Sequence, residues 1–381
     1  MFSLRRFNAV AKKEFLEIKR NKLFFVLTVL APIILYFLFA YGFPLSSKHI
    51  PTGVVDLDKS AKSRMLIDTF SCATDLFNIK MVGSTYAPLE REMDLGNLRQ
   101  IIVVPSGFSK DILRSKPVTV QVLIDGTYPN MANINSAYVE AIITAFRMQV
   151  LQEYFLKKLG SQGAVYMPID VMVSGWYNPS FRSEDFILPG IIAMVLMFFP
   201  PMVGAVSLAK EKETGSILNM YCSRITKTEY LLGKMFPYVV ISYINFALFF
   251  VLSIFLFNVP MRGSIVLVLI VSFFFVATAI AVGLLVAVLV STQVAAILIT
   301  TVVTLTPSFL YSGFMVPVQS ISQNSRWMCY SLPATYYIDF MRKIMVKGAT
   351  FAYVRLDTIA IIIFCIGIYV LCIKLFKKRV G

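Results

Sequence analysis

The chain of 381 residues is 57% hydrophobic and only 15% charged, whereas a soluble globular protein usually carries about 25% charged residues. Its net charge is +15, but residues 44–185 hold equal numbers of basic and acidic residues, so the excess lies next to apolar segments. This distribution is typical of a membrane protein and argues against a nucleic-acid-binding face. The single histidine, His49, excludes a histidine-based zinc site, no GxSxG occurs, and the five cysteines show no CxxC spacing. We therefore expect neither a metal site nor a catalytic site.

Six charge-poor stretches are long enough to cross a bilayer, whose hydrocarbon core of about 30 Å needs about 20 helical residues. The predicted spans are 23–43, 186–208, 236–257, 264–290, 294–316 and 358–373. The fourth and fifth share one uncharged stretch, in which the most polar interruption is Ser291-Thr292-Gln293. The sixth is short, but charged side chains at its ends can snorkel. The sequence thus predicts an α-helical polytopic membrane protein.

Basic residues set the predicted orientation. Lys and Arg concentrate in residues 1–22, in 209–235 and after residue 373, and with six spans these three segments fall on one side. By the positive-inside rule that side is the cytoplasm, so we expect both termini there. The basic segment 317–356 runs against the rule. The long first apolar stretch without a small-residue cleavage site favours an anchor over a cleaved signal peptide.

The N-terminal lead is patterned as a helix. Apolar residues recur at helical spacing on one stripe, which consists of Leu4, Phe7, Ala11, Phe15 and Ile18. Basic residues occupy the other faces. We expect residues 1–22 to form an amphipathic helix in the inner headgroup layer, in contact with membrane lipids. The alternative is a disordered basic tail.

Residues 44–185 form the water-soluble part of the chain and are numerous enough for their own core. Apolar runs predict strands at 50–57, 79–83, 100–104 and 118–124. Helices are predicted at 63–77, 89–98, 109–114 and 131–159. This alternation indicates a small α/β domain, inserted after the first span and placed outside the cell by the predicted topology.

Two further segments are candidates for a role in the mechanism. The stretch 209–235 combines a charge cluster at 210–213 with Gly215 and the apolar pair Ile217-Leu218, which favours a short surface helix that docks on a partner; the alternative is a solvated connector. The stretch 317–356 is rich in aromatic residues, proline and glycine, which favours a re-entrant helical hairpin at the outer membrane interface; the alternative is an exposed loop.

Several fragments carry a resemblance to a known family. They are YNP at 177–179 with FILPG at 186–190, KEKETGS at 210–216, LGK at 232–234, SGF at 312–314, the stretch 342–348, and the domain fragments 54–60 and 104–109. In this order and spacing they resemble ABC-2 type permeases, in the branch with a large extracytoplasmic domain that includes bacterial drug-efflux and sodium-export permeases. The sequence departs from the family pattern at Arg224 and Ser322, where relatives often have proline, and at Leu218, where an acidic residue is frequent.

The resemblance implies a permease subunit of an exporter in the bacterial inner membrane, without an ATPase of its own. ATP and Mg²⁺ would be held by two copies of a separate ABC ATPase, and the permease would form a homo- or heterodimer, with a periplasmic adaptor left open and no nucleic acid involved. The residues implied in ATPase coupling are Lys210, Glu211, Lys212, Glu213, Gly215, Ser216, Glu229, Gly233 and Lys234. Those implied in the outer hairpin are Ser312, Gly313, Phe314, Pro317, Pro333, Tyr336 and Arg342.

The sequence agrees with a separate energy source, because it contains no GxxxxGK[ST] phosphate-binding loop. We expect a small or amphiphilic cargo, drug-like or ionic. Two other classes compete with this hypothesis. An ion-driven transporter would need ionisable residues inside the spans, and the predicted spans contain no Asp or Glu. A non-transporting receptor or secretion accessory with the same outer domain is the remaining alternative.

Overall fold

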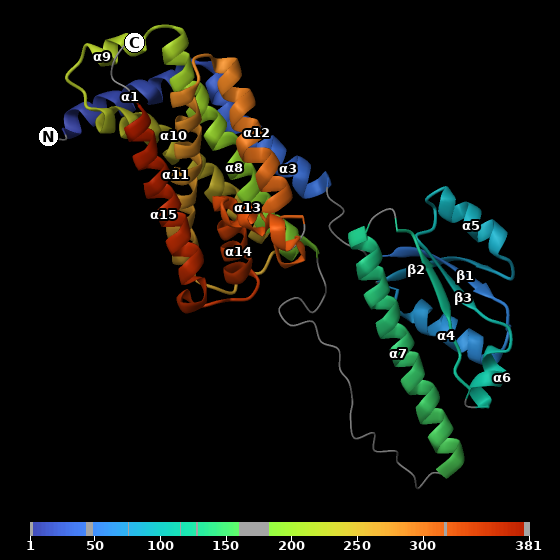
Figure 1. Ribbon diagram of the computed structural model, residues 1–381. Helices are drawn as coiled ribbons and strands as arrows, with labels where there is room; N and C mark the ends of the chain where they lie inside the picture. Colours follow the sequence, from blue (N-terminus) through green and yellow to red (C-terminus); the bar gives the residue numbers. More distant parts are fainter. Residues whose placement is uncertain are drawn as a thin grey trace. The chain divides into compact units, whose positions relative to one another are not determined.

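The computed structural model describes residues 3–42, 49–74, 76–114, 116–126, 129–159, 183–315 and 318–376 (Figure 1). It consists of two compact units. A helical unit comprises Met1–Leu45 and Trp176–Gly381, and an inserted domain comprises Ser46–Gly175. The insertion falls where the sequence predicts the water-soluble block.

Five helices in the described part of the chain are long and apolar enough to cross a membrane. They are α8 (Ser183–Glu213), α10 (Lys227–Phe255), α11 (Ile265–Leu289), α12 (Gln293–Tyr311) and α15 (Phe351–Leu375). The first predicted span is a shorter apolar helix, Val26–Gly42, built from the π-helical turn η1 (Val26–Leu30) and α3 (Ala31–Gly42) and preceded by α2 (Lys22–Phe25). The protein is therefore a multi-pass membrane protein, while a count of six spans stays a prediction.

Helix α8 is the centre of the helical unit. Most of its apolar stretch is buried, and it packs against α3, α10, α11, α12 and α14. Its closest neighbour is α11, because a Cβ atom at Gly283 would lie only 1.8 Å from the carbonyl oxygen of Pro201. Glycine is thus required where the proline-containing part of α8 meets α11.

The ends of the helical unit carry short helices. Figure 1 shows α1 (Leu4–Arg20) and α9 (Ile217–Tyr221) at one end. At the other end lie α13 (Arg326–Tyr330) and α14 (Pro333–Met345), which follow the single turns η2 (Val318–Ser320) and η3 (Gln323–Ser325). Helices α13 and α14 occupy the segment predicted as a re-entrant hairpin, and the packed face of α14 is fully buried.

The residues of the predicted apolar stripe on α1 differ in burial. Ala11 and Ile18 are buried, whereas Leu4 and Phe15 are exposed. The helix lies against α10, and its buried residues are Val10, Ala11, Glu14 and Ile18. A glutamate is accepted on this face because α10 supplies it with a cation, as described below.

The inserted domain is an α/β domain. Its sheet has the order β2-β1-β3-β4, with β1 (Ile50–Asp56) parallel to β2 (Phe77–Gly83) and to β3 (Gln100–Val104), and with β4 (Gln121–Ile124) antiparallel to β3. Helices α4 (Ala61–Cys72), α6 (Phe108–Leu113) and α7 (Pro129–Leu159) share one apolar core with the sheet. Helix α5 (Tyr86–Asp94) contributes to a second core that includes Val55 and Ile101. The helix predicted at 63–77 ends at Cys72, because Phe77 already belongs to β2.

Candidate functional site

The candidate coupling residues lie where α1, the end of α8, α9 and the start of α10 meet. The stretch predicted as one loop, 209–235, is mostly helical: α8 continues to Glu213 and α10 begins at Lys227. Gly215 ends α8 with a φ of 72°, the left-handed conformation that glycine adopts most easily. The charge cluster 210–213 is therefore the last turn of a long helix and not part of a connector.

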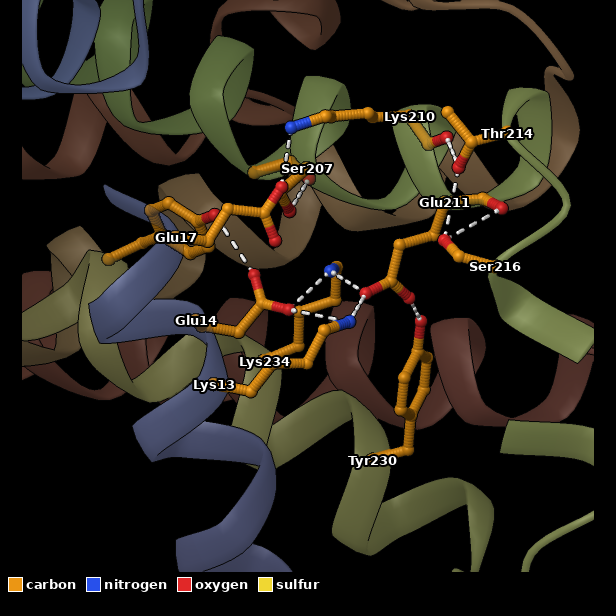
Figure 2. A network of polar contacts seen from close by, with 12 residues as sticks. Lys13, Glu14, Glu17, Ser207, Lys210, Glu211, Thr214, Ser216, Tyr230 and Lys234 are labelled. Carbon is orange, nitrogen blue, oxygen red and sulfur yellow. Dashed lines mark hydrogen bonds and ion pairs between the residues drawn. The ribbon is translucent and has the colours of Figure 1, made fainter. Parts of the chain in front are cut away.

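A buried ion-pair network forms the centre of this site (Figure 2). The Lys234 ammonium lies 2.8 Å from Glu14 Oε1 and 3.2 Å from Glu211 Oε1. Lys234 has no exposed surface, and Glu14 and Glu211 are 1% and 4% exposed. Buried charges of this kind are stable only when they are paired and hydrogen-bonded. The network thus joins three helices, α1, α8 and α10, through charges that water does not reach.

Tyrosines and a second lysine complete the network. Tyr238 donates to Glu14 Oε2 at 3.0 Å, and Tyr230 donates to Glu211 Oε2. The ammonium of Lys13 pairs with Glu211, and the Lys13 side chain is half-exposed. Two carboxylates and two ammonium groups therefore balance one another at the centre of the site.

Burial raises the pKa of the Glu14 carboxyl above that of an ordinary glutamate, and the positive charge of Lys234 acts in the opposite direction. The oxygens of Glu14, Glu17 and Glu211 lie close enough together to hold a metal ion. Each of these three carboxylates already binds an ammonium group, from Lys234, Lys210 and Lys13. The arrangement therefore fits an ion-pair network better than a metal centre.

The other residues of the charge cluster each contact a different helix. Lys210 reaches Glu17 of α1 at 2.5 Å. Lys212 donates to the carbonyl oxygens of residues 287, 288 and 290 at 2.6, 2.7 and 3.0 Å, at the end of α11. Glu213 accepts from the backbone N–H of Gln293 at 2.8 Å, at the start of α12. A cation at a helix C-terminus and an anion at a helix N-terminus are both favourable, because they complement the unpaired carbonyl and N–H groups there.

Two further predicted coupling residues hold α1 on α10. Glu229 is fully buried; it caps α10 by accepting from the N–H of Thr226 at 2.8 Å and accepts from the N–H of Ser3 at 2.6 Å. At Gly233 a Cβ atom would lie 2.9 Å from Val10 Cβ, so α1 approaches α10 closely there. Glu229 and Gly233 are buried and thus position α1 against α10.

The part of this region that faces outward lies after α8. Helix α9 buries Ile217 and Met220, while Leu218 is 47% exposed. The exposed residues around it form what we call the α9 surface, which consists of Thr214, Ser216, Leu218, Asn219, Cys222 and Arg224. Among the predicted coupling residues, Glu211, Glu229, Gly233 and Lys234 are thus buried, whereas Glu213 and Ser216 are exposed.

At the opposite end of the helical unit, Arg342 of α14 connects three segments. Its guanidinium donates to the carbonyl oxygens of Phe186, Gly313 and Phe314 at 3.1, 2.7 and 3.2 Å and lies 3.5 Å from the Phe186 ring centroid. The planar fork of arginine suits such multiple contacts. Arg342 therefore fastens α14 to the start of α8 and to the segment after α12.

The remaining outer-hairpin residues have individual roles. Pro333 is the first residue of α14, and Tyr336 donates to the carbonyl of Tyr330 at 3.0 Å. Ser312 is buried next to Gly313, which has a φ of 82°. Pro317 lies outside the described residues.

Sequence reasoning missed the half of the network that comes from α1 and from two tyrosines. Glu14 and Glu17 are the only acidic residues in the otherwise basic segment 1–22, which is a signal that the sequence does contain. Tyr230 and Tyr238 show no comparable signal, because tyrosine is common throughout this chain.

Comparison with known proteins agrees with the fold. The family model described as "ABC-2 family transporter protein" matches residues 22–374. The chain is similar to the probable multidrug ABC transporter permease YbhS of Escherichia coli strain K12, with 28% identity over 359 residues, 91% of this chain and 90% of the relative. The related permease YbhR of the same organism is 24% identical over 344 residues, 89% of each chain. ABC transporter G family member 20 of Dictyostelium discoideum is 27% identical over 350 residues, 91% of this chain and 47% of that longer protein. Since the family model covers nearly the whole chain, this protein belongs to the ABC-2 family of transporter proteins.

Proposed function

We propose that this chain is the permease subunit of an exporter that is driven by ATP hydrolysis on a separate ABC ATPase subunit. The observation that carries the proposal is the charge cluster 210–213, whose four side chains contact α1, α10, α11 and α12 directly beside the exposed α9 surface. A partner that moves the α9 surface would act on all of these helices. A conformational change of this kind requires that the partner bind two states with different affinity.

The names of the similar proteins support the same function. YbhS and YbhR are described as probable multidrug ABC transporter permeases, and each matches this chain over nearly its full length. We propose a small or amphiphilic cargo, which the description of these relatives as multidrug permeases supports. The proposed working unit is a dimer of permease subunits, homo- or heteromeric, with two ATPase chains that bind ATP and Mg²⁺.

The proposed orientation places the α9 surface in the cytoplasm. Helix α1 carries six basic residues, and it lies at the same end of the helical unit as the last turn of α8, which adds Lys210 and Lys212 (Figure 1). The positive-inside rule assigns that end to the cytoplasm, where an ATPase has access to it. In this orientation the inserted domain lies on the outer side of the membrane, which we propose is a bacterial inner membrane.

Site-specific cross-linking tests both partner and orientation. A variant without the native cysteines receives Leu218→Cys on the α9 surface or, as a matched control, Trp327→Cys in α13, where the side chain is 68% exposed. We expect a photoactivatable cross-linker at residue 218, and not at residue 327, to capture a chain that 8-azido-ATP also labels and that mass spectrometry identifies as an ABC ATPase. Capture from residue 327 alone, or reaction of residue 218 with an impermeant thiol reagent in intact cells, would refute the proposal.

A further inference from the structure

The inserted domain contains a cavity of about 860 Å³. It lies between α4, α6, α7 and the segment 117–120, all within this one domain. Its size is in the range of small-molecule binding sites. The residues that line it are Lys62, Leu66, Phe108, Ile112, Leu113, Lys116, Pro117, Val118, Thr119, Val120, Ile143, Phe146, Arg147, Val150, Leu151 and Glu153.

The cavity wall is largely apolar. Leu66, Phe108 and Phe146 belong to the buried core of the domain, and the rings of Phe108 and Phe146 stack with centroids 6.1 Å apart. Leu113 and Leu151, by contrast, are 69% and 38% exposed although they line the same cavity. The wall therefore runs from the hydrophobic core to apolar residues at the surface, as a site for an aliphatic chain requires.

The charged residues of the lining are mainly basic. Lys62 is paired with Glu153, the only acidic residue in the lining. Lys116 and Arg147 are exposed, and within the described part of the chain no carboxylate forms an ion pair with either. An apolar cavity with two such cations at its edge is complementary to a molecule that is aliphatic at one end and anionic at the other.

We propose that this cavity binds a single-chain anionic amphiphile. The aliphatic chain lies against Phe108, Ile143 and Phe146, and the carboxylate or phosphate lies near Lys116 and Arg147. The site is separate from the coupling site, so the proposal goes beyond the transport function and does not depend on it.

The test uses the full-length protein in phosphatidylcholine nanodiscs, without detergent, which would compete for the cavity. A dodecanoate with a terminal diazirine is photoactivated, and labelled peptides are mapped by mass spectrometry. We expect labels in 108–120 and 143–151. Unlabelled fatty carboxylates should compete about fourfold more strongly for each added methylene, measured against free aqueous concentration, until the cavity is full. Lysophosphatidylglycerol competes in a parallel series, which distinguishes a lipid source from a free fatty acid.

Two variants separate charge from shape. The double variant Lys116→Glu/Arg147→Glu changes only exposed side chains and should weaken competition by dodecanoate about tenfold while improving that of dodecyltrimethylammonium. Lys80→Glu, on β2 and outside the lining, is the matched control and should change neither. Ile143→Trp should shorten the preferred chain, because the larger side chain occupies part of the cavity.

Three results would overturn the proposal. One is labelling confined to the helical unit. Another is competition by dodecyltrimethylammonium that equals that of dodecanoate in the wild-type protein. The third is a cross-linker at Leu113→Cys that captures only residues 154–182 of the same chain, which would show that the cavity is filled by the protein itself.

Discussion

The ammonium of Lys234 lies 2.8 Å from a carboxylate oxygen of Glu14, and neither side chain reaches the solvent. The two residues are 220 positions apart, on α10 and α1. Their pairing explains why an N-terminal helix with a basic surface lies against a membrane helix that begins with Lys227. Removal of one charge leaves the other buried, which is the basis of the first prediction.

We expect Lys234→Met to destabilise the helical unit by about 3–5 kcal/mol, because Glu14 and Glu211 would then be close together without their common cation. Thermal unfolding in nanodiscs measures the effect. The control is Lys13→Met, which should destabilise the helical unit less because the Lys13 side chain is half-exposed. The double variant Glu14→Gln/Lys234→Met should recover part of the loss, since Lys13 and Glu211 remain paired. Additive losses would contradict the pairing.

Lys212 and Glu213 lead to a prediction in which each variant is the control for the other. Lys212→Ala should accelerate amide exchange at the end of α11, in 286–290, and Glu213→Ala should do so at the start of α12, in 293–296. A lost hydrogen bond to a charged group is worth about 1.5–3 kcal/mol, so local exchange should rise about ten- to hundredfold. Hydrogen exchange with mass spectrometry gives the answer. Equal effects of both variants on both helices would rule out the separate contacts.

The contact of α11 with α8 predicts a strong effect of one added methyl group. Gly283→Ala places a Cβ atom against the Pro201 carbonyl, and overpacking of this kind typically costs about 1–3 kcal/mol. Gly367→Ala in α15 has no atom within 4 Å of the new Cβ and should be neutral or slightly stabilising. Thermal unfolding of both variants compares them. A Gly283→Ala protein as stable as the wild type would mean that the helices are further apart than described.

Acid should loosen the inserted domain at α6. The Asp58 carboxylate accepts from the N–H groups of Gly107 and Ser109 at 2.9 and 3.0 Å, and a hydrogen bond from Ser60 together with these two lowers the pKa of Asp58. Because the pKa is lowered on folding, the contribution is complete above the unfolded value of about 3.9 and is lost as the pH falls through the folded value. Amide exchange of Gly107 and Ser109, corrected for intrinsic rates, should therefore become faster in acid. Asp58→Asn should abolish this dependence, and its persistence would assign the effect to another group.

Much of the fold could be predicted from local patterns. Apolar length located the membrane helices, apolar runs located the strands, and the resemblance to ABC-2 permeases is confirmed by the family match over residues 22–374. The boundaries at the membrane end were less accurate, because the charges of 210–213 look like those of a loop. They can belong to a packed helix because Lys13 and Glu17 pair with them from almost 200 residues away, and Lys234 pairs with Glu211 from α10.

The candidate site shows the same limit. The sequence placed Glu211, Glu229 and Lys234 in one region, and the structure brings Glu211 and Lys234 into contact. The sequence did not indicate that these side chains are buried, because burial depends on contacts with distant residues that local spacing cannot reveal. Loss of Glu211 would therefore disturb the folded network, which makes the exposed Leu218 the better position for testing the proposed contact with an ATPase.

The adjacent residues Lys212 and Glu213 have a mechanical consequence. Lys212 binds the last turn of α11, and Glu213 binds the first turn of α12. The last turn of α8 therefore holds both ends of the short link between α11 and α12. We expect a displacement of this last turn of α8 to act on the end of α11 and on the start of α12 together, because its side chains are bonded to both.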